Sequence, residues 1–482
     1  MQLLGLTITE IHKLYQSKTI SVGDYIKAVY QAMQKDFASN FLVTICEEPD
    51  YSKLEQYFDK DNILSGIPYL AKDNFWTMDL RTTAGSKILS NFQPTEDSTV
   101  IKKLRDKSTV LLGKTTLDEL GMGGTGLFGF NGKVANPFDT TRIAGGSSSG
   151  SAYAVAKGYV PFATGSDTGD SIRKPASFVG VVGFKPTYGS LSRYGVIPYA
   201  PSLDHLGYFT RNVEDMALVC DATYGFDKKD FTSIANPADF ASHLNDLHKN
   251  AKFGYIKDVQ KYIDGKLAKA YEKLYQKIKA DGHEVIEIDF SKKLLDALPA
   301  VYMMISFSEA VSTHSNLDGI NFGERVEGKD YIETIKKSRA SGFGMNVKKR
   351  FVIGSYQLRK ENQELLLAKS KKVRTLIIKE LQKAYELVDI LILPPALDIA
   401  PKISEVVGVD VEDRQDDEKV FLQDLLILAN FNGMPSITIP FIKKEEMPIG
   451  INLNAKPTAD LLVLQAAKYV EGLVQQGGFA ND

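Results

Sequence analysis

The sequence predicts an α/β fold, in which one large α/β/α domain spans residues 1–482 and a central mixed, twisted sheet is covered by helices on both faces. Short apolar runs typical of strands alternate with amphipathic runs typical of crossover helices. No linker, repeat or low-complexity tract divides the chain. With 43% hydrophobic and 24% charged residues, the composition is that of an ordinary globular protein with a sizeable core.

The individual elements follow this alternation along the chain. A first helix is expected to be capped at Thr7 or Thr9. A second, amphipathic helix is predicted over residues 21–35, and its apolar side consists of Val22, Tyr25, Ile26, Val29 and Met33. Further helices are predicted over residues 51–59, 98–105, 150–157, 213–222, 267–280 and 459–475. Strands are predicted over residues 41–46, 67–71, 109–112, 159–164, 253–256, 284–288, 391–393, 437–439 and 449–453. The segment from about 294 to 387 is mostly helical.

The apolar strand at 67–71 ends in a charged residue, Lys72, which Asp73 and Asn74 follow. A charge at the end of a buried strand is unfavourable unless the group is used or paired. Lys72 is therefore a candidate functional residue, although composition alone favours a structural role.

Glycine and serine are concentrated between residues 143 and 188 more than anywhere else in the chain. Glycine is tolerated at such density where the backbone adopts positive φ or approaches another group closely, and serine adds a hydroxyl with little bulk. Ser147 follows two glycines, and Ser171 follows a turn at 167–170. The helix and strand between them can bring both hydroxyls to one rim of the sheet, so we expect the chemistry here.

The segment Gly124-Thr125-Gly126-Leu127-Phe128-Gly129 matches the dinucleotide-binding fingerprint in form. That fingerprint leaves a strand, opens a helix and has an acidic residue about 20 positions on. Here it follows a short helix and runs into turn signals at 131–132 and 136–137. We therefore interpret residues 121–132 as a loop that packs near the site.

The segment Gly146-Ser147-Ser148-Ser149-Gly150 matches the nucleophile elbow of α/β-hydrolases, with Ser148 as the nucleophile. That elbow follows a strand, whereas residues 136–142 are turn-like. It also needs a catalytic histidine later in the chain. The later histidines have sequence contexts typical of surface or helix residues; they are His205, His243, His248, His283 and His314. A serine–histidine hydrolase is therefore disfavoured.

Charge, cysteine content and hydropathy disfavour several classes of protein. The formal net charge is −2, so any RNA contact would be a local patch or be made by a partner. Cys46 and Cys220 have no metal-ligand spacing and are expected to be buried free thiols; no metal site is predicted. No signal-like N-terminus is present, and no apolar stretch has the roughly 18 residues of a membrane helix. We expect a cytoplasmic protein without membrane contact.

Two glycine-serine turns and a third motif together resemble the amidase signature family. The family has a GGSSGG-like turn, a GSDTGGSIRxPA turn and a GxxGxKPT segment, which match residues 145–150, 165–176 and 180–187. The two serines are 24 residues apart, and Lys72 lies 75 residues before Ser147, as the family's lysine does. The resemblance implies the amidase signature fold.

Within that family, the whole chain resembles the A subunits of tRNA-dependent amidotransferases that act on Glu-tRNA(Gln) or Asp-tRNA(Asn). This finer resemblance is carried by segments at residues 114–119, 192–197, 202–204, 209–215, 308–310, 318–319 and 372–377. It implies glutamine as the ammonia donor and no cofactor in this chain. It also implies a B subunit that amidates mischarged Glu-tRNA(Gln) with ATP and Mg, and a small C subunit that wraps the pair.

The resemblance implies a catalytic triad of Lys72, Ser147 and Ser171. A serine hydroxyl is a weak nucleophile that needs a base within reach, and a desolvated, neutral lysine is a workable base. We expect Ser171 to attack the glutamine carboxamide, Ser147 to relay the proton next to a cis peptide bond, and Lys72 to accept it. The oxyanion hole would consist of the backbone N–H groups of Thr168, Gly169, Asp170 and Ser171, each contributing roughly 3 kcal/mol.

The family further suggests an arginine for the α-carboxylate of glutamine and an acid for its α-ammonium group, which map to Arg350 and Asp424. One residue departs from the family pattern, because Asp170 stands where glycine is usual. Aimed inward, its carboxylate would repel the oxyanion and favour protonated Lys72. Aimed outward, toward Lys174, it would be nearly neutral, and we expect this outward pose.

Two other functions remain open at this point. A free-standing amidase for small amides would share the triad but would lack the additional segments. A catalytically impaired family member, kept as a structural partner, would follow if Asp170 disables the oxyanion loop. The sequence does not distinguish Glu-tRNA(Gln) from Asp-tRNA(Asn).

Overall fold

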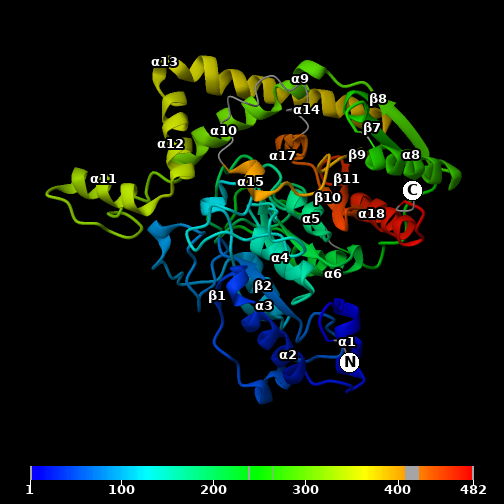
Figure 1. Ribbon diagram of the computed structural model, residues 1–482, viewed down its shortest axis with the longest axis horizontal. Coiled ribbons are helices and arrows are strands. Elements are labelled where there is room, and N and C mark those ends of the chain that lie inside the picture. Colours follow the sequence, from blue (N-terminus) through cyan, green and yellow to red (C-terminus); the bar gives the residue numbers. More distant parts are fainter. Residues whose placement is uncertain (1–2, 237–238, 264, 408–422, 480–482) are drawn as a thin grey trace.

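The computed structural model describes residues 3–236, 239–263, 265–407 and 423–479 (Figure 1). Within them the strands form one 11-stranded sheet in the order β1-β3-β2-β4-β6-β5-β10-β11-β9-β7-β8. The strands are β1 Leu42–Ile45, β2 Pro68–Lys72, β3 Val110–Thr115, β4 Phe162–Asp167, β5 Val182–Lys185, β6 His205–Thr210, β7 Lys252–Ile256, β8 Glu284–Ile288, β9 Ile390–Leu393, β10 Ser436–Lys444 and β11 Met447–Ala455.

The sheet is mixed, as the sequence predicts. Strands β3, β2 and β4 are parallel, and so are β9, β7 and β8. Neighbours from β4 through β6, β5, β10 and β11 to β9 are antiparallel, as are β1 and β3. β6 has no counterpart among the predicted strands, because a glycine in its middle weakens the strand pattern. That glycine, Gly207, permits close contact with β5: a Cβ there would lie 2.0 Å from the carbonyl oxygen of Phe184.

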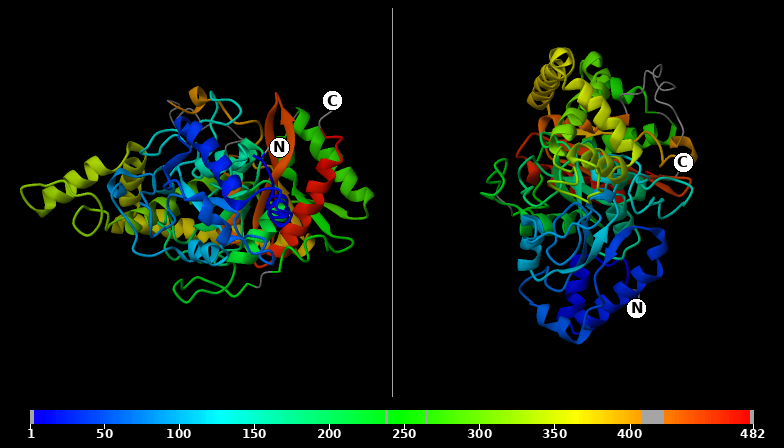
Figure 2. Two further views of the ribbon diagram at one scale, coloured as in Figure 1. Left: turned by 90° about the horizontal axis from the view of Figure 1, so that it is seen from below. Right: turned by 90° about the vertical axis from the view of Figure 1, so that its left-hand side faces the viewer.

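Helices lie along both sides of the sheet in the three views (Figures 1 and 2). They are α1 Ile8–Gln16, α2 Val22–Lys35, α3 Thr99–Asp106, α4 Ser149–Ala156, α5 Arg173–Val179, α6 Val213–Thr223, α7 Lys257–Gln260, α8 Gly265–Ala280, α9 Lys292–Asp296, α10 Leu298–Thr313, α11 Tyr331–Gly342, α12 Met345–Gln357, α13 Lys360–Gln363, α14 Lys369–Leu387, α15 Ile403–Val406, α17 Ile427–Asn432 and α18 Asp460–Gln475. A π-helical turn, Glu364–Ala368, joins α13 to α14.

Two large hydrophobic cores occupy the two faces of the sheet. Side chains of a strand alternate between faces, and in β9 Ile390 and Ile392 belong to one core while Leu391 and Leu393 belong to the other. The first core also contains residues of α8 and α18, and the second contains residues of α10 and α14. The prediction of helices on both faces is confirmed.

The N-terminal helices also form as predicted. Thr7 caps α1, where its side chain accepts from the Glu10 N–H and the Glu10 carboxylate accepts from the Thr7 N–H. The predicted apolar side of α2 is buried, from Val22 to Met33.

One helical stretch within the described residues, Lys292–Thr313, is long and apolar enough to cross a membrane by length and composition alone. By this criterion the expectation that no stretch reaches that length is wrong. The helix α10 within it packs against α12 and α14, and core helices pass the same test.

Candidate active site

The candidate site lies where the carboxyl ends of two neighbouring parallel strands meet. β2 ends at Lys72, and β4, paired with it in parallel, ends at Asp167. Ser147 immediately precedes the N-cap residue of α4, and Ser171 lies in the turn between β4 and α5. The structure therefore brings the two serines and Lys72 to one edge of the sheet, as expected.

The ammonium nitrogen of Lys72 is completely buried and surrounded by serine oxygens. Nζ lies 2.9 Å from Ser147 Oγ, 2.8 Å from Ser148 Oγ and 2.9 Å from Ser166 Oγ. Burial lowers the pKa of Lys72 to about 7, against the opposing fields of the Asp118, Asp167 and Asp204 carboxylates. A lysine with this pKa is partly neutral at physiological pH and can act as a base.

Ser147 and Ser148 have different surroundings although both contact Lys72. The peptide bond between Gly146 and Ser147 is cis, as the resemblance implied. The carbonyl of Ser147 accepts from the Asp118 N–H at 3.1 Å. The Ser148 hydroxyl instead donates to the carbonyl of Ser166 at 3.1 Å and is fully buried, which makes it a poor nucleophile.

Ser171 is held beside this cluster through its backbone. Its carbonyl accepts from the Ser148 N–H at 3.3 Å. Among the described residues no hydrogen bond joins the Ser171 hydroxyl to Ser147 or Lys72. Catalytic hydrogen bonds are often long or poorly aligned without substrate and tighten when substrate binds.

The turn at residues 168–171 has free backbone donors. Within the described chain, none of its four N–H groups donates a hydrogen bond to the protein. The turn is nevertheless fixed from outside: the Thr168 hydroxyl donates to Asp204 at 2.6 Å, and Arg173 donates to the carbonyl of Gly169 at 2.7 Å. Fixed, unbonded N–H groups are what an oxyanion hole requires.

A buried ion pair anchors this turn, and the sequence did not single it out. The guanidinium of Arg173 pairs with Asp167 at 2.9 Å, and both side chains are fully buried. Arg173 also donates to the carbonyl of Leu426 and to the side-chain oxygen of Asn430, each at 2.7 Å. The Asn430 amide in turn donates to Asp167. Burial raises the pKa of the Asp167 carboxyl group, but the charge of Arg173 and these hydrogen-bond donors lower it by more. The pKa of Asp167 therefore lies below its usual range.

Asp170 points away from the lysine cluster. Its carboxylate pairs with Lys174 at 2.5 Å, one helical turn further along, and Lys174 also donates to the carbonyl of Gln423 at 2.6 Å. The expected outward pose is confirmed. Asp424 follows Gln423, whose carbonyl Lys174 binds. Burial lowers the pKa of Lys174, but the charges of Asp170 and Asp424 outweigh this effect, so its pKa lies above the usual value.

Arg350 reaches the site from α12. It donates to the Tyr199 hydroxyl at 2.9 Å, and its guanidinium lies 5.0 Å from the ring centre of Phe307. Tyr302 of α10, which the sequence did not indicate, packs on the turn at residues 168–171, since a Cβ at Gly169 would lie 3.1 Å from its ring. The sequence around Arg350 is basic, which is equally typical of a solvent-exposed helix face, so its inward direction could not be predicted from this pattern.

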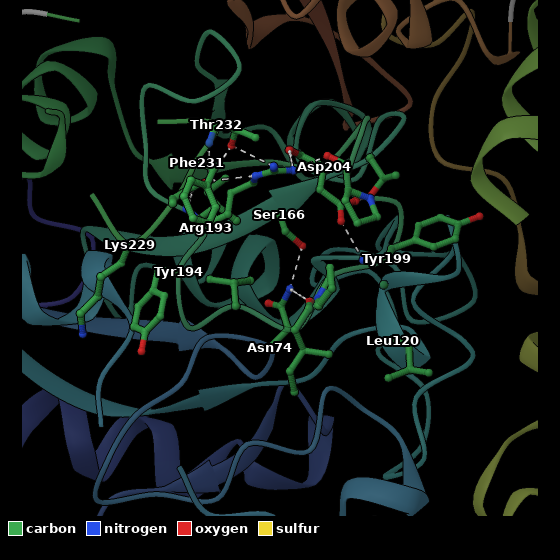
Figure 3. A pocket seen from close by; sticks show the side chains of 18 residues that line it. Asn74, Leu120, Ser166, Arg193, Tyr194, Tyr199, Asp204, Lys229, Phe231 and Thr232 are labelled. Atoms are coloured by element: carbon green, nitrogen blue, oxygen red, sulfur yellow. Dashed lines mark hydrogen bonds and ion pairs between the residues drawn. The ribbon is translucent and has the colours of Figure 1, made fainter. Parts of the chain in front are cut away.

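A pocket of about 360 Å³ opens beside the site (Figure 3). Ser166 and Asn74 lie at its centre and point toward each other, with Asn74 donating to Ser166 Oγ at 3.1 Å. The same Ser166 oxygen accepts from Lys72, so the pocket reaches the lysine cluster. Other lining residues include Thr168, Arg193, Tyr199, Asp204 and Phe231.

The glycine-rich loop at 121–132 surrounds a buried carboxylate. The N–H groups of Thr125, Gly126 and Phe128 donate to Asp118 at 3.3, 3.1 and 2.9 Å. Gly146 needs its lack of side chain here, because a Cβ would lie 2.2 Å from Asp118 Oδ2. The loop packs near the site, as interpreted above, and three of its backbone N–H groups donate to the Asp118 carboxylate.

Expectations for the histidines and cysteines need two corrections. His205 was expected at the surface or in a helix, but it is a buried residue of β6. The expectation was wrong because this strand was not predicted. His205 Nδ1 lies 2.7 Å from the carbonyl of Leu203, and within the described residues it bonds no serine. Both cysteines are free thiols, but only Cys220 is buried, whereas Cys46 is partly exposed. The described residues contain no group of three or more His, Cys, Asp or Glu that could hold a metal ion.

The chain is similar to known amidases over almost its whole length. The family model described as "Amidase" matches residues 22–464. The chain is 39% identical to the A subunit of the glutamyl-tRNA(Gln) amidotransferase of Mycoplasma pneumoniae, over 97% of this chain and 98% of that protein.

Solved structures agree with this result. The A subunit of the glutamyl-tRNA(Gln) amidotransferase from Thermotoga maritima superposes with a TM-score of 0.80 at 30% identity, covering 98% of this chain and 95% of that one. A structure described as an amidase gives a TM-score of 0.80 at 27% identity, covering 97% of this chain and all of that one. With its paired serine turns, buried lysine and shared sheet, the chain belongs to the amidase family.

Proposed function

We propose that this chain is the glutaminase subunit of a tRNA-dependent amidotransferase, which supplies ammonia to convert Glu-tRNA(Gln) to Gln-tRNA(Gln). The observation that carries the chemistry is the contact of Lys72 Nζ with Ser147 Oγ, in a buried cluster beside four unbonded backbone N–H groups. The similarity over 97% of the chain to the A subunit of a glutamyl-tRNA(Gln) amidotransferase supports the choice of reaction.

In the proposed mechanism Ser171 Oγ attacks the side-chain carboxamide carbon of glutamine. Its proton passes through the Ser147 hydroxyl to neutral Lys72, and the N–H groups of residues 168–171 stabilise the oxyanion. When the C–N bond breaks, Lys72 returns the proton through Ser147 to the leaving nitrogen, which departs as ammonia. Water then attacks the acyl-Ser171 ester by the same proton route and releases glutamate.

Arg350 and Asp424 are the proposed contacts for the amino-acid end of glutamine. A guanidinium suits the α-carboxylate and a carboxylate suits the α-ammonium group. Arg350 is supported by its inward direction, and Asp424 by its position near Lys174 beside the oxyanion turn.

The proposal includes partners and a location. A B subunit would bind ATP and Mg and hold the mischarged Glu-tRNA(Gln), and a C subunit would complete a cytoplasmic heterotrimer. This chain itself, one amidase domain over residues 1–482, would need no cofactor, because Lys72 and the two serines supply the acid, base and nucleophile.

The test is glutamate release from glutamine by the purified chain, with and without its B and C subunits. We expect poor hydrolysis by the chain alone and a clear gain in the complex, because the donor site is coupled to ammonia use. Strong activity of the lone chain on varied small amides, without partner binding, would support a free-standing amidase. A complex that uses ammonium but releases no glutamate would identify an impaired family member.

A further inference from the structure

Helix α12 is apolar on two opposite faces. Its inner face packs on α10 through Val347, Phe351 and Gly354, which are buried. On the outer face Met345 is 67% exposed, Val352 70% and Tyr356 55%. These three residues are seven and four positions apart, so they form one stripe along the helix. A helix that is apolar all round is normally buried on all sides.

The inner face of α12 is a wall of the active site. Gly354 lies so close to α10 that a Cβ there would be 2.2 Å from the carbonyl oxygen of Phe307, and Ser308 of α10 donates to Gln357 at 2.7 Å. Phe307 also contacts the guanidinium of Arg350, which α12 carries on the side away from the outer stripe. The position of Arg350 is therefore fixed by how α12 sits on α10.

The exposed stripe continues past the end of α12. Leu365 in the π-helical turn is 70% exposed. Figure 1 shows α12 rising to the corner at α13, with α11 projecting from its base away from the rest of the molecule. Between Met345 and Leu376 six basic side chains are exposed against two acidic ones, although the whole chain has a net charge of −2; the basic ones are Lys349, Arg359, Lys360, Lys369, Lys371 and Lys372, and the acidic ones are Glu361 and Glu364. The stripe is thus set in a basic surround.

The composition of this surface favours a protein partner over a nucleic acid. Protein interfaces have an apolar centre inside a polar rim, whereas nucleic-acid interfaces are more polar and consist mainly of phosphate contacts. Three large exposed apolar side chains along one helix fit the first pattern. The basic surround then selects a partner surface whose rim carries carboxylates.

We propose that the outer stripe of α12, formed by Met345, Val352 and Tyr356 and extended by Leu365, docks a partner protein with an apolar centre and an acidic rim, and that docking sets the position of Arg350. The inference rests on the proposed function, in which the chain acts together with B and C subunits. It makes α12 the element through which partner binding reaches the glutamine site.

Val352→Glu and Met345→Glu test this proposal, because glutamate is a good helix former at an exposed position and leaves the fold intact. Phe226→Glu is the matched control: Phe226 is 64% exposed and follows α6, which lies well apart from α12 in Figure 1. Binding of each variant to the co-purified B and C subunits is measured by calorimetry, together with the KM for glutamine with and without them.

We expect the two α12 variants to bind the B and C subunits at least tenfold more weakly than the wild type does. When these subunits are added, the KM of each variant for glutamine should stay at the value of the chain alone. Phe226→Glu should match the wild type in both measurements. Unchanged partner binding by both α12 variants, with a wild type that does bind, overturns this inference and leaves the proposed function standing. A wild type that binds neither subunit overturns both. Normal subunit binding with weakened Glu-tRNA(Gln) binding assigns the stripe to RNA and overturns the protein partner.

Discussion

Asp170 and Lys174 form an ion pair of 2.5 Å that turns the Asp170 carboxylate away from Lys72. The pair is one turn apart at the start of α5, and Lys174 is held in place by the carbonyl of Gln423. The Asp170 carboxylate is thereby held away from the turn that we propose as the oxyanion hole.

Asp170→Gly should change glutamine turnover by less than about tenfold, which is about 1.4 kcal/mol in the barrier. The reason is that the paired carboxylate adds little charge where the oxyanion develops. Steady-state glutamate release in the full complex measures this. An inactive wild-type complex restored by Asp170→Gly would show instead that the carboxylate disables the site.

Lys174→Met should reduce kcat more than Asp170→Gly does, because it leaves Asp170 unpaired beside the oxyanion turn. The double variant Asp170→Gly/Lys174→Met should recover most of the loss, since the unpaired charge is gone. A double-mutant cycle on kcat measures the coupling. Additive effects of the two changes would contradict an ion pair that acts on the turn.

Ser171→Ala and Lys72→Ala should each abolish glutamine-dependent amidation of Glu-tRNA(Gln) and leave amidation from ammonium largely intact. Ammonium bypasses the chemistry of this chain, whereas glutamine needs both the nucleophile and the base. Ser148→Ala is the control, because its buried hydroxyl is already donated to Ser166. A silent Ser171→Ala with an inactive Ser148→Ala would assign the nucleophile to Ser148.

Glutaminase activity should fall as pH decreases through about 7. Burial lowers the pKa of Lys72 to about 7, so below that pH the amine becomes protonated and cannot accept the proton from Ser147. The plot of log kcat/KM against pH should rise with a slope near one below pH 7 and level off above it. Activity that persists unchanged to pH 5 would exclude Lys72 as the base.

Arg173→Met should lower the free energy of unfolding by about 3–5 kcal/mol, because it leaves the fully buried Asp167 carboxylate without its partner. Lys174→Met removes a partly exposed pair and should cost about 1 kcal/mol or less. Urea unfolding of both variants at pH 7 makes the comparison. Equal losses would mean that water reaches the Asp167–Arg173 pair.

The sequence was sufficient where local patterns determine the site. Two glycine-serine turns located Ser147 and Ser171, and an apolar strand with a terminal charge located Lys72. The pose of Asp170 followed from a lysine four residues away. The anchor of the turn at residues 168–171 could not be predicted, because Arg173 and Asn430 are 257 residues apart in the chain and meet only where α17 contacts the end of β4 at Asp167. Tyr302 was missed for the same reason, whereas the strand that buries His205 was missed because Gly207 weakens its local pattern.

The reach of Arg173 also has a consequence for how the protein is made. Its partner Leu426 follows 253 residues later, which at 5–20 residues per second is roughly 13 to 50 s of translation. Throughout that interval a nascent chain already contains Lys72, Ser147 and Ser171, but the turn proposed to stabilise the oxyanion lacks the support that Leu426 and Asn430 give to Arg173. We expect ribosome-bound and prematurely terminated chains to release no ammonia, so incomplete synthesis consumes no glutamine.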